Sequence, residues 1–270
     1  MTTAISHDAG RSAPAMAVSL RGLTKIFSPG TERAKVAVNR LDLDIPQGAF
    51  YGLVGRNGAG KTTALLMLTG LLRPTEGVAT VSGVDVWSQP RTAKMLMGVL
   101  PDGMNFFERL SGRQLVTYTG LLRGMPRDLL AERTDDVLKA MDLMADAETP
   151  VQDYSAGMRK KIMLAAAMVH APRLLVLDEP FEAVDPVSAT NIRELLQDFT
   201  QAGGTVIVSS HVMDLVQRMC DHVAIIDGGQ LLAAGTVEHV RGQKTLEDTF
   251  VDLVGGRTHV GERLSWLRPQ

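Results

Sequence analysis

Residues 55–62 have the types and spacing of a loop that binds phosphate groups. The segment reads Gly-Arg-Asn-Gly-Ala-Gly-Lys-Thr, fits the pattern G-x-x-x-x-G-K-[ST] and directly follows an apolar run. Glycines let the backbone curl so that successive N–H groups converge on phosphate oxygens at a helix N-terminus. Lys61 adds a positive charge, and the Thr62 hydroxyl can ligate Mg²⁺. The pattern predicts a nucleotide site formed by Gly55, Arg56, Asn57, Gly58, Ala59, Gly60, Lys61, Thr62 and Thr63.

Two carboxylates follow a second apolar run. Residues 174–177, Leu-Leu-Val-Leu, have the composition of a buried parallel strand, and Asp178 and Glu179 come directly after them. Successive strand residues point to opposite sides, so the two acids should do different work at the carboxyl edge of a sheet. We expect Asp178 to hold the Mg²⁺ shell and Glu179 to orient and deprotonate an attacking water. Alone, such a pair would be interpreted as a solvated turn.

A third motif lies between these two. Residues 154–158 read Tyr-Ser-Ala-Gly-Met. With the phosphate loop and the carboxylates, they resemble the nucleotide-binding subunit of ATP-binding-cassette (ABC) transporters over residues 17–255. The resemblance implies that Ser155 and Gly157 cap a helix N-terminus that binds the γ-phosphate held by a second subunit. A serine N-cap and a bare glycine backbone suit that role, because they leave N–H groups free for an anion.

The motif departs from the commonest family form, Leu-Ser-Gly-Gly-Gln, at Tyr154, Ala156 and Met158. Similar Tyr-Ser-x-Gly-Met forms are typical of a branch rich in exporters, in which cassettes and membrane subunits are separate chains. The basic run 159–161 that follows is interpreted as a solvated helix face, and no ligand is assigned to it.

The resemblance extends to two segments after the carboxylates. Residues 182–186, Glu-Ala-Val-Asp-Pro, resemble the family's dimer-contact loop, normally Ser-Gly-Leu-Asp-Pro, and Asp185 keeps its acidic position. The run 205–210 then leads to His211, which matches the family's switch histidine. A histidine at a strand end can hydrogen-bond the γ-phosphate and hold the catalytic geometry.

Two further residues match the family by their place in the chain. Phe27 stands where the family has an aromatic residue that stacks on adenine, for which a ring face is suited; packing in the first hairpin is the alternative. Asp102 stands in the loop between core and helical subdomain, where most members have Gln and many exporters have Glu. We expect Asp102 to reach Mg²⁺ or the attacking water and to report the nucleotide state to a membrane partner.

These motifs need a sheet that brings their strand ends together. Apolar runs at 49–54, 174–177 and 205–209 each precede a motif and alternate with helical stretches, as in a mostly parallel sheet with crossover helices. Together with the resemblance, the pattern predicts an α/β fold. We expect a P-loop NTPase core with an antiparallel β region at the N-terminus and an inserted helical subdomain.

The helical insertion is expected over about residues 95–171, where the strand signal disappears and the apolar spacing becomes helical. Ser111, with a glutamine three residues later, forms a capping-box sequence, and Pro126 is placed in the first turn of a helix. Helices are predicted through residues 115–122, 129–144 and 162–169.

The composition is that of an ordinary globular protein of 270 residues, with 45% hydrophobic and 21% charged residues. A net charge of −2 argues against a strongly basic nucleic-acid binder. The longest apolar run, 162–169, is far shorter than the ~20 residues of a membrane-spanning helix. We interpret residues 1–16 as a flexible tail, 17–255 as the ABC ATPase domain and 256–270 as a C-terminal extension.

The leading hypothesis is an ATPase that uses ATP and Mg²⁺ and powers export through integral-membrane permease subunits of a separate chain. The resemblance implies a dimer of cassettes, expected to be a homodimer, at the cytoplasmic face of the cell membrane, without nucleic acid. Cassettes that act on ribosomes usually occur twice in one chain, and those that act on chromosomes contain long coiled coils. The alternative is a soluble ABC ATPase that scaffolds an assembly without a membrane partner.

Overall fold

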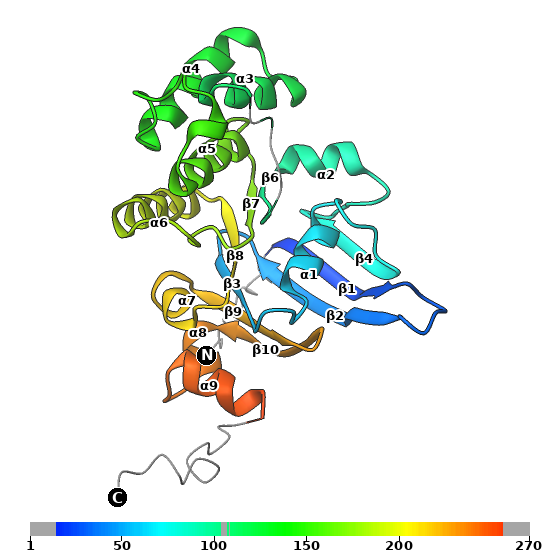
Figure 1. Ribbon diagram of the computed structural model, residues 1–270. Coiled ribbons are helices and arrows are strands. Elements are labelled where there is room, and N and C mark those ends of the chain that lie inside the picture. The colour runs from blue at the N-terminus through cyan, green and yellow to red at the C-terminus, as the bar shows by residue number, and fades with distance from the viewer. Residues whose placement is uncertain (1–14, 104–106, 108, 256–270) are drawn as a thin grey trace, which may run out of the picture.

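The computed structural model describes residues 15–103, 107 and 109–255 (Figure 1). The expected extension 256–270 lies outside the described residues. The expected tail also lies outside them, except for Ala15 and Met16, and Met16 begins the first strand. Figure 1 shows a group of helices, α3 to α5, at one end of the molecule above the two sheets.

The larger sheet has six strands, and its carboxyl edge brings the motifs together. Its order is β10 (Gln230–Thr236), β9 (His222–Asp227), β3 (Phe50–Val54), β8 (Thr205–Ser210), β7 (Leu174–Leu177) and β6 (Met97–Leu100). Every pairing from β9 to β6 is parallel, and β10 runs antiparallel to β9 at the edge. The loops after β3, β7 and β8 therefore emerge at the same edge of the sheet.

Side chains on the two faces of the parallel strands enter two separate hydrophobic cores. In β3, Tyr51 and Leu53 pack in the core that faces the second sheet, whereas Phe50 and Val54 pack on the opposite face. This division follows from the two-residue period of a strand. Burial on both faces explains why β3 has a continuous apolar sequence rather than an alternating one.

The smaller sheet is antiparallel, as predicted for the N-terminal region. Its order is β2 (Lys35–Pro46), β1 (Met16–Phe27), β4 (Glu76–Val81) and β5 (Val84–Asp85). Helix α1 (Lys61–Leu68) contacts β1, β2 and β4. Its Leu65 and Leu68 share one core with Leu41 of β2 and Tyr51 of β3. This core fixes α1, and with it the phosphate loop, between the two sheets.

Four helices that follow β7 in the chain bury apolar side chains in the core on the other face of the larger sheet, which they share with the helices within residues 112–168. Each contributes at least one buried residue, such as Leu196, Val216, Val237 or Phe250. These helices are α6 (Pro186–Gln201), α7 (Met213–Met219), α8 (Val237–Arg241) and α9 (Leu246–Leu253). None of the helices in the described ranges combines the length and apolarity needed to cross a bilayer.

The helical region is built from α3 (Gly112–Leu122), α4 (Arg127–Ala140), the short 3-10 turn η1 (Val151–Asp153) and α5 (Ala156–Met168). Ser111 forms the predicted capping box: its hydroxyl accepts the Gln114 N–H, and the Gln114 side chain accepts the Ser111 N–H. The Tyr154 hydroxyl donates to the Asp146 carbonyl at 2.7 Å, which ties the start of α5 to the loop after α4.

This region also contains a strand that was not predicted from the sequence. Residues 97–100 form β6, which pairs with β7 in the main sheet, so the expected insertion at 95–171 begins with a strand of the core. Met-Gly-Val-Leu is too short and too uniformly apolar for its periodicity to distinguish a strand from a helix. Helix α2 (Pro90–Leu96) precedes it.

The helix bounds also differ from those predicted, because apolar spacing does not mark the polar first turns. Helix α3 begins at Gly112, as the capping box at Ser111 predicted, whereas α5 begins at Ala156 rather than 162. Helix α4 begins at Arg127 and ends at Ala140 rather than 144. Pro126 therefore occupies the N-cap position and not the first turn.

Candidate nucleotide site

The loop between β3 and α1 requires glycine for two physical reasons. Gly60, the N-cap of α1, has φ +106°, and a Cβ there would lie 2.5 Å from the Ala37 carbonyl oxygen. At Gly55, a Cβ would lie 2.2 Å from the Ile226 carbonyl oxygen of β9. A larger residue would therefore push the loop away from β2 and β9. The loop keeps its backbone open at the N-terminus of α1, where anions bind well.

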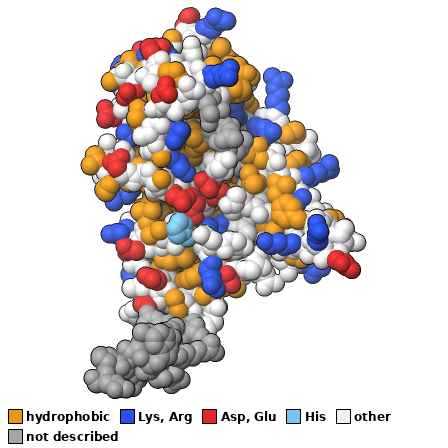
Figure 2. Space-filling model, in the orientation of Figure 1, with side chains coloured by type: hydrophobic (Ala, Val, Ile, Leu, Met, Phe, Trp, Pro, Cys, Tyr) orange, Lys and Arg blue, Asp and Glu red, His pale blue; other side chains and the backbone are white. Residues whose placement is uncertain are grey.

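A cleft of about 460 Å³ lies over this loop. It brings together residues from the first hairpin, the phosphate loop, the loop after β6, and the loops after β7 and β8. Figure 2 shows a histidine next to a group of acidic side chains near the middle of this face of the molecule. The lining consists of Phe27, Lys35, Ala37, Arg56, Asn57, Gly58, Ala59, Gly60, Lys61, Thr62, Thr63, Asp102, Glu179, Glu182 and His211.

Lys61 presents a buried cation at the floor of the cleft. Its side chain is 6% exposed, and Nζ donates to the carbonyl oxygens of Gly55 at 2.7 Å and Arg56 at 3.2 Å. Burial lowers the pKa of Lys61, and the nearby carboxylates of Glu179 and Asp178 partly oppose that shift. Nζ also lies 3.8 Å from Glu179 Oε1. The loop thus holds its cation next to the acidic strand end.

Asp178 is buried and has one carboxylate oxygen available for a cation. Oδ1 accepts a hydrogen bond from the Ser209 hydroxyl, whereas Oδ2 is buried and has no hydrogen-bond partner among the described residues. Such an atom is costly to bury unless a ligand satisfies it. In the described ranges, no group of three or more His, Cys, Asp or Glu side chains could hold a metal ion. A single buried carboxylate such as Asp178 fits Mg²⁺, which uses one or two protein ligands together with phosphate oxygens and water.

Glu179 points into the cleft from a strained backbone position. It has φ +45°, a left-handed conformation that is rare for a residue with a side chain. Its N–H donates to Ser209 Oγ at 2.9 Å, and its Oε1 lies 3.1 Å from His211 Nδ1. The two adjacent acids therefore have different surroundings: Asp178 lies in the core and Glu179 lines the cleft.

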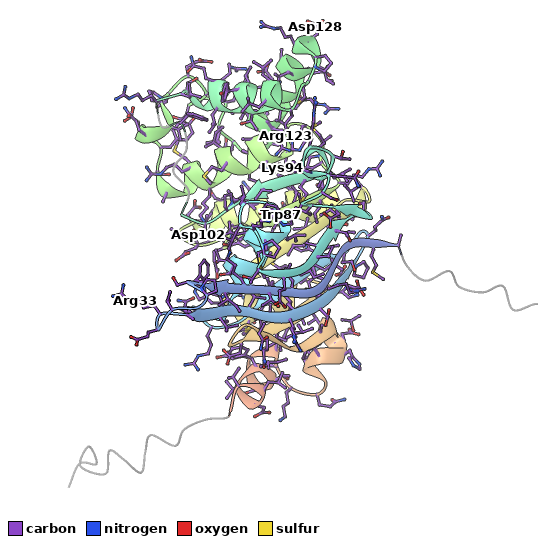
Figure 3. All side chains as sticks on the ribbon, turned by 90° about the vertical axis from the view of Figure 1, so that its right-hand side faces the viewer. Arg33, Trp87, Lys94, Asp102, Arg123 and Asp128 are labelled. Carbon is purple, nitrogen blue, oxygen red and sulfur yellow. The ribbon has the colours of Figure 1, made fainter. Side chains whose placement is uncertain are left out.

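Phe27 and Asp102 both line the cleft. The Phe27 ring is 40% exposed, and the Lys25 ammonium lies 5.3 Å from its centroid. Asp102 lies 3.5 Å from the Lys160 ammonium and comes from the loop after β6. Figure 3 shows Asp102 at the level where the upper helices meet the sheets.

Five of the sequence-predicted residues are not among those that line this cleft: Gly55 and Asp178, described above, and Ser155, Gly157 and Asp185. The Ser155 hydroxyl caps α5 by accepting the Met158 N–H, and the Asp185 carboxylate caps α6 by accepting the Val187 and Ser188 N–H groups. These hydrogen bonds lower the pKa of Asp185. A Cβ built on Gly157 would lie 3.8 Å from Asp185 Oδ2, so the two segments are neighbours within one chain.

Two residues that contact the strand-end acids, Ser209 and Lys160, were not predicted from the sequence. Ser209 lies two residues before His211 in the chain. It contacts both Asp178 and Glu179, which are far from it in the sequence. Lys160 belongs to the run interpreted as a solvated face, yet its ammonium donates to the Glu179 carbonyl at 2.9 Å. A polar residue at the end of a buried strand is the signal that could have identified Ser209.

This combination of a glycine loop at a helix N-terminus, a buried lysine and a buried strand-end carboxylate defines a phosphate-loop nucleotide-binding protein. Residues 38–182 match the ABC transporter family, and this chain belongs to that family. Its membership confirms the predicted family and the predicted ATPase activity.

Several curated proteins are similar to most of the chain. The ATP-binding protein NatA of Bacillus subtilis is 35% identical over 78% of this chain and 87% of its own length. The daunorubicin/doxorubicin resistance ATP-binding protein DrrA of Streptomyces peucetius is 35% identical over 84% of this chain and 68% of its own length. A Nod factor export ATP-binding protein I of Cupriavidus metallidurans is 36% identical, covering 81% and 70%.

Solved structures share the fold. The ATP-binding subunit of an ABC transporter has a TM-score of 0.80 at 23% identity, covering 88% of this chain and 99% of the other. A dimeric ATP-binding cassette bound to ADP and Pi has a TM-score of 0.75 at 22% identity, covering 82% and 98%. The predicted α/β phosphate-loop fold is confirmed.

Proposed function

We propose that this chain hydrolyses ATP to power export of a substrate through separate integral-membrane permease subunits. Export is favoured over import because two similar proteins are named for drug resistance or export. One is a daunorubicin/doxorubicin resistance protein and the other is a Nod factor export protein. The Tyr-Ser-Ala-Gly-Met form of residues 154–158 supports the same branch. The relatives named above give no support to the alternative of a soluble scaffold.

Phe27 and the phosphate loop bind ATP in this proposal. The exposed Phe27 ring at the entrance of the cleft stacks on adenine. The backbone N–H groups of residues 55–62 and the Lys61 ammonium bind the β- and γ-phosphates. Lys61 exchanges its carbonyl contacts for phosphate oxygens, a small displacement within the same loop.

Thr62 and Asp178 are the proposed protein ligands of Mg²⁺. The ion, when bound, neutralises negative charge on the β- and γ-phosphate oxygens. The unpartnered Oδ2 of Asp178 supports this assignment, as does the position of Thr62 in the cleft at the start of α1. The Ser209 hydroxyl on Oδ1 orients the Asp178 carboxylate.

Glu179, His211 and Asp102 are the proposed catalytic residues. The Glu179 carboxylate orients a water for attack on the γ-phosphorus and accepts its proton. His211, 3.1 Å from that carboxylate, holds it in place and donates to the γ-phosphate. Asp102 lines the same cleft, and its carboxylate contacts either the attacking water or the Mg²⁺ ion in this proposal.

Ser155, Gly157 and Asp185 act on the nucleotide of a second subunit in this proposal, expected to be a second copy of the chain. Unlike Asp178, which is buried, Ser155 and Asp185 are exposed outside the cleft of their own chain, and this supports the role. Ser155 is exposed at the N-terminus of the 13-residue helix α5. A helix N-terminus directed at a partner's nucleotide would stabilise its γ-phosphate.

The proposed location is the cytoplasmic face of the membrane, bound to the permease, with no nucleic-acid partner. The test begins by asking whether an adjacent gene encodes a protein with several apolar segments of ~20 residues. That protein is then expressed with the chain, and the complex is purified and reconstituted in lipid. We expect the two proteins to copurify and ATP hydrolysis to be stimulated by the permease. Failure to form a complex, with hydrolysis unaffected, would contradict the transport role.

The direction of transport needs a separate measurement. In inside-out vesicles, ATP-dependent accumulation of a test compound is expected for an exporter. ATP-dependent movement in the opposite direction, after loading the vesicle lumen, would identify an importer instead.

A further inference from the structure

The peptide that carries Glu179 is held from two different parts of the molecule. On the N-terminal side, the Glu179 N–H donates to Ser209 of β8 at 2.9 Å. On the C-terminal side, the Glu179 carbonyl accepts a hydrogen bond from Lys160 Nζ of α5 at 2.9 Å. The core sheet and the helical region thus both determine how this residue is placed.

The backbone of Glu179 needs such support. Its φ of +45° brings its Cβ close to its own carbonyl oxygen, and residues other than glycine remain there only where surrounding contacts fix them. The charged donor of Lys160 makes one of the stronger contacts available to a carbonyl. Loss of that contact would leave the strained peptide, and the carboxylate attached to it, free to relax.

Lys160 is well placed to act in this way. Its side chain is only 16% exposed, and its ammonium also lies 3.5 Å from Asp102 Oδ1. Lys160 stands on the same helix that Ser155 caps, in the turn that follows the 154–158 motif. One ammonium therefore connects α5, the loop after β6 and the strand-end acid.

We propose that Lys160 is a positioning residue for ATP hydrolysis. Lys160 binds the Glu179 carbonyl oxygen and thereby fixes the orientation of the Glu179 carboxylate. Because Lys160 stands on α5 and also pairs with Asp102, that orientation depends on the placement of the helical region and of the loop after β6. This inference rests on the proposed role of Glu179 as the base. It predicts that Lys160 affects the rate of the chemical step and not the binding of ATP, since Lys160 is not among the residues that line the cleft.

The test compares four variants of the full chain in steady-state ATP hydrolysis. Lys160→Met keeps the length of the side chain but removes its charge, and Lys160→Arg keeps a charged donor. Arg159→Met is the matched control, because Arg159 is an exposed basic residue on the same helix. Glu179→Gln tests the proposed base directly.

We expect Lys160→Met to lower kcat by about tenfold or more, because a small displacement of a catalytic group is costly to the rate. Its KM, and its affinity for a fluorescent ATP analogue, should stay within about twofold of wild type. Lys160→Arg should recover kcat to within about threefold, and Arg159→Met should behave as wild type. If Lys160→Met does not fold, Lys160→Gln makes the same comparison, since its amide carries no charge and is one atom shorter than the lysine side chain.

A Lys160→Met protein as active as the Arg159→Met control would overturn the inference. A loss of ATP affinity as large as the loss of kcat, or an arginine variant as slow as the methionine variant, would do the same. The two proposals fail separately. A fully active Glu179→Gln variant contradicts the proposed base, whereas a slow Glu179→Gln with a fully active Lys160→Met contradicts only the role of Lys160.

Discussion

The hydroxyl of Ser209 donates a hydrogen bond to the carboxylate of Asp178 within the core. Ser209 lies on β8, beside β7, and its side chain is completely buried. Its oxygen also accepts the N–H of Glu179. One side chain therefore ties both acids of the strand end to the neighbouring strand and determines how they are spaced.

Replacing Ser209 with alanine is expected to lower the free energy of unfolding by about 1–3 kcal/mol, because a buried carboxylate oxygen loses the hydrogen bond that Ser209 donates. We also expect slower ATP hydrolysis, since both acids lose a fixed neighbour. Urea denaturation and steady-state hydrolysis measure the two effects. Ser210→Ala is the control, because the Ser210 hydroxyl at the end of β8 accepts the N–H of Val212, which is neither of the two acids. Equal effects in the two variants would argue against a special role for Ser209.

Lys61→Ala should reduce ATP affinity by about 100-fold or more, because the phosphates lose a buried cation in a site otherwise made of backbone dipoles. Displacement of a fluorescent ATP analogue measures the affinity, with Lys139→Ala on the exposed side of α4 as the control. Undiminished ATP affinity in the Lys61 variant would refute the assignment of the phosphate loop.

Glu179→Gln should bind ATP normally and hydrolyse it slowly, since the amide keeps the shape of the side chain but does not accept the proton of water. ATP should then accumulate on the protein and trap a dimer, which size-exclusion chromatography with light scattering can detect. A variant that stays monomeric with ATP, even together with its membrane partner, would contradict the proposed dimer in which each subunit acts on the nucleotide of the other.

Asp102→Ala is expected to affect coupling more than affinity. ATP binding should stay within a few-fold of wild type, whereas hydrolysis should slow and respond weakly to the membrane subunit, because the Lys160 ammonium and the cleft lose a carboxylate. Asp102→Glu should preserve function, because it keeps an anionic oxygen. The measurement is ATP hydrolysis of the reconstituted complex. Full stimulation of the alanine variant would show that Asp102 is only a solvated loop residue.

His170 should make the stability of the protein depend on pH. Its Nε2 lies 3.1 Å from the Met97 carbonyl oxygen, and its Nδ1 is buried with no hydrogen-bond partner in the part of the chain that the structure describes. Burial lowers the pKa of His170 to about 4, and the positive charge of Arg123 adds to the shift. Between the unfolded pKa of about 6.5 and the folded value, the unfolded chain binds more protons than the folded protein.

The free energy of unfolding should therefore have its full His170 contribution above pH 6.5 and lose it as the pH falls towards 4. Urea denaturation of wild type and His170→Gln at pH 7, 5.5 and 4.5 tests this, because glutamine does not titrate. The difference in stability between the two proteins should shrink as the pH falls. A difference that stays constant with pH would show that His170 titrates normally in the folded protein.

The phosphate loop could be predicted because its determinants lie within one short segment. A glycine pattern, a following lysine and threonine, and a preceding apolar run dictate a tight turn at a helix N-terminus without help from distant residues. The capping box at Ser111 is local in the same sense. The α/β class could also be predicted, because buried parallel strands have continuous apolar sequences.

The strand β6 and the ends of the helices could not be predicted in the same way. A four-residue apolar segment such as 97–100 becomes a strand because β7 offers a row of unpaired backbone groups beside it. Pro126 stands at the N-cap of α4 and not in its first turn, and the proline itself is compatible with both positions.

The contacts of the strand-end acids depended entirely on the packing of elements far apart in the chain. Sequence places Lys160 on a basic helix face, but its burial and its bond to the Glu179 carbonyl exist only because α5 packs near the end of β7. In the same way, Ser209 contacts Asp178 because β8 pairs with β7. A side chain's chemical type is fixed by its own residue, whereas its partner, burial and charge environment are set by the elements that fold against it.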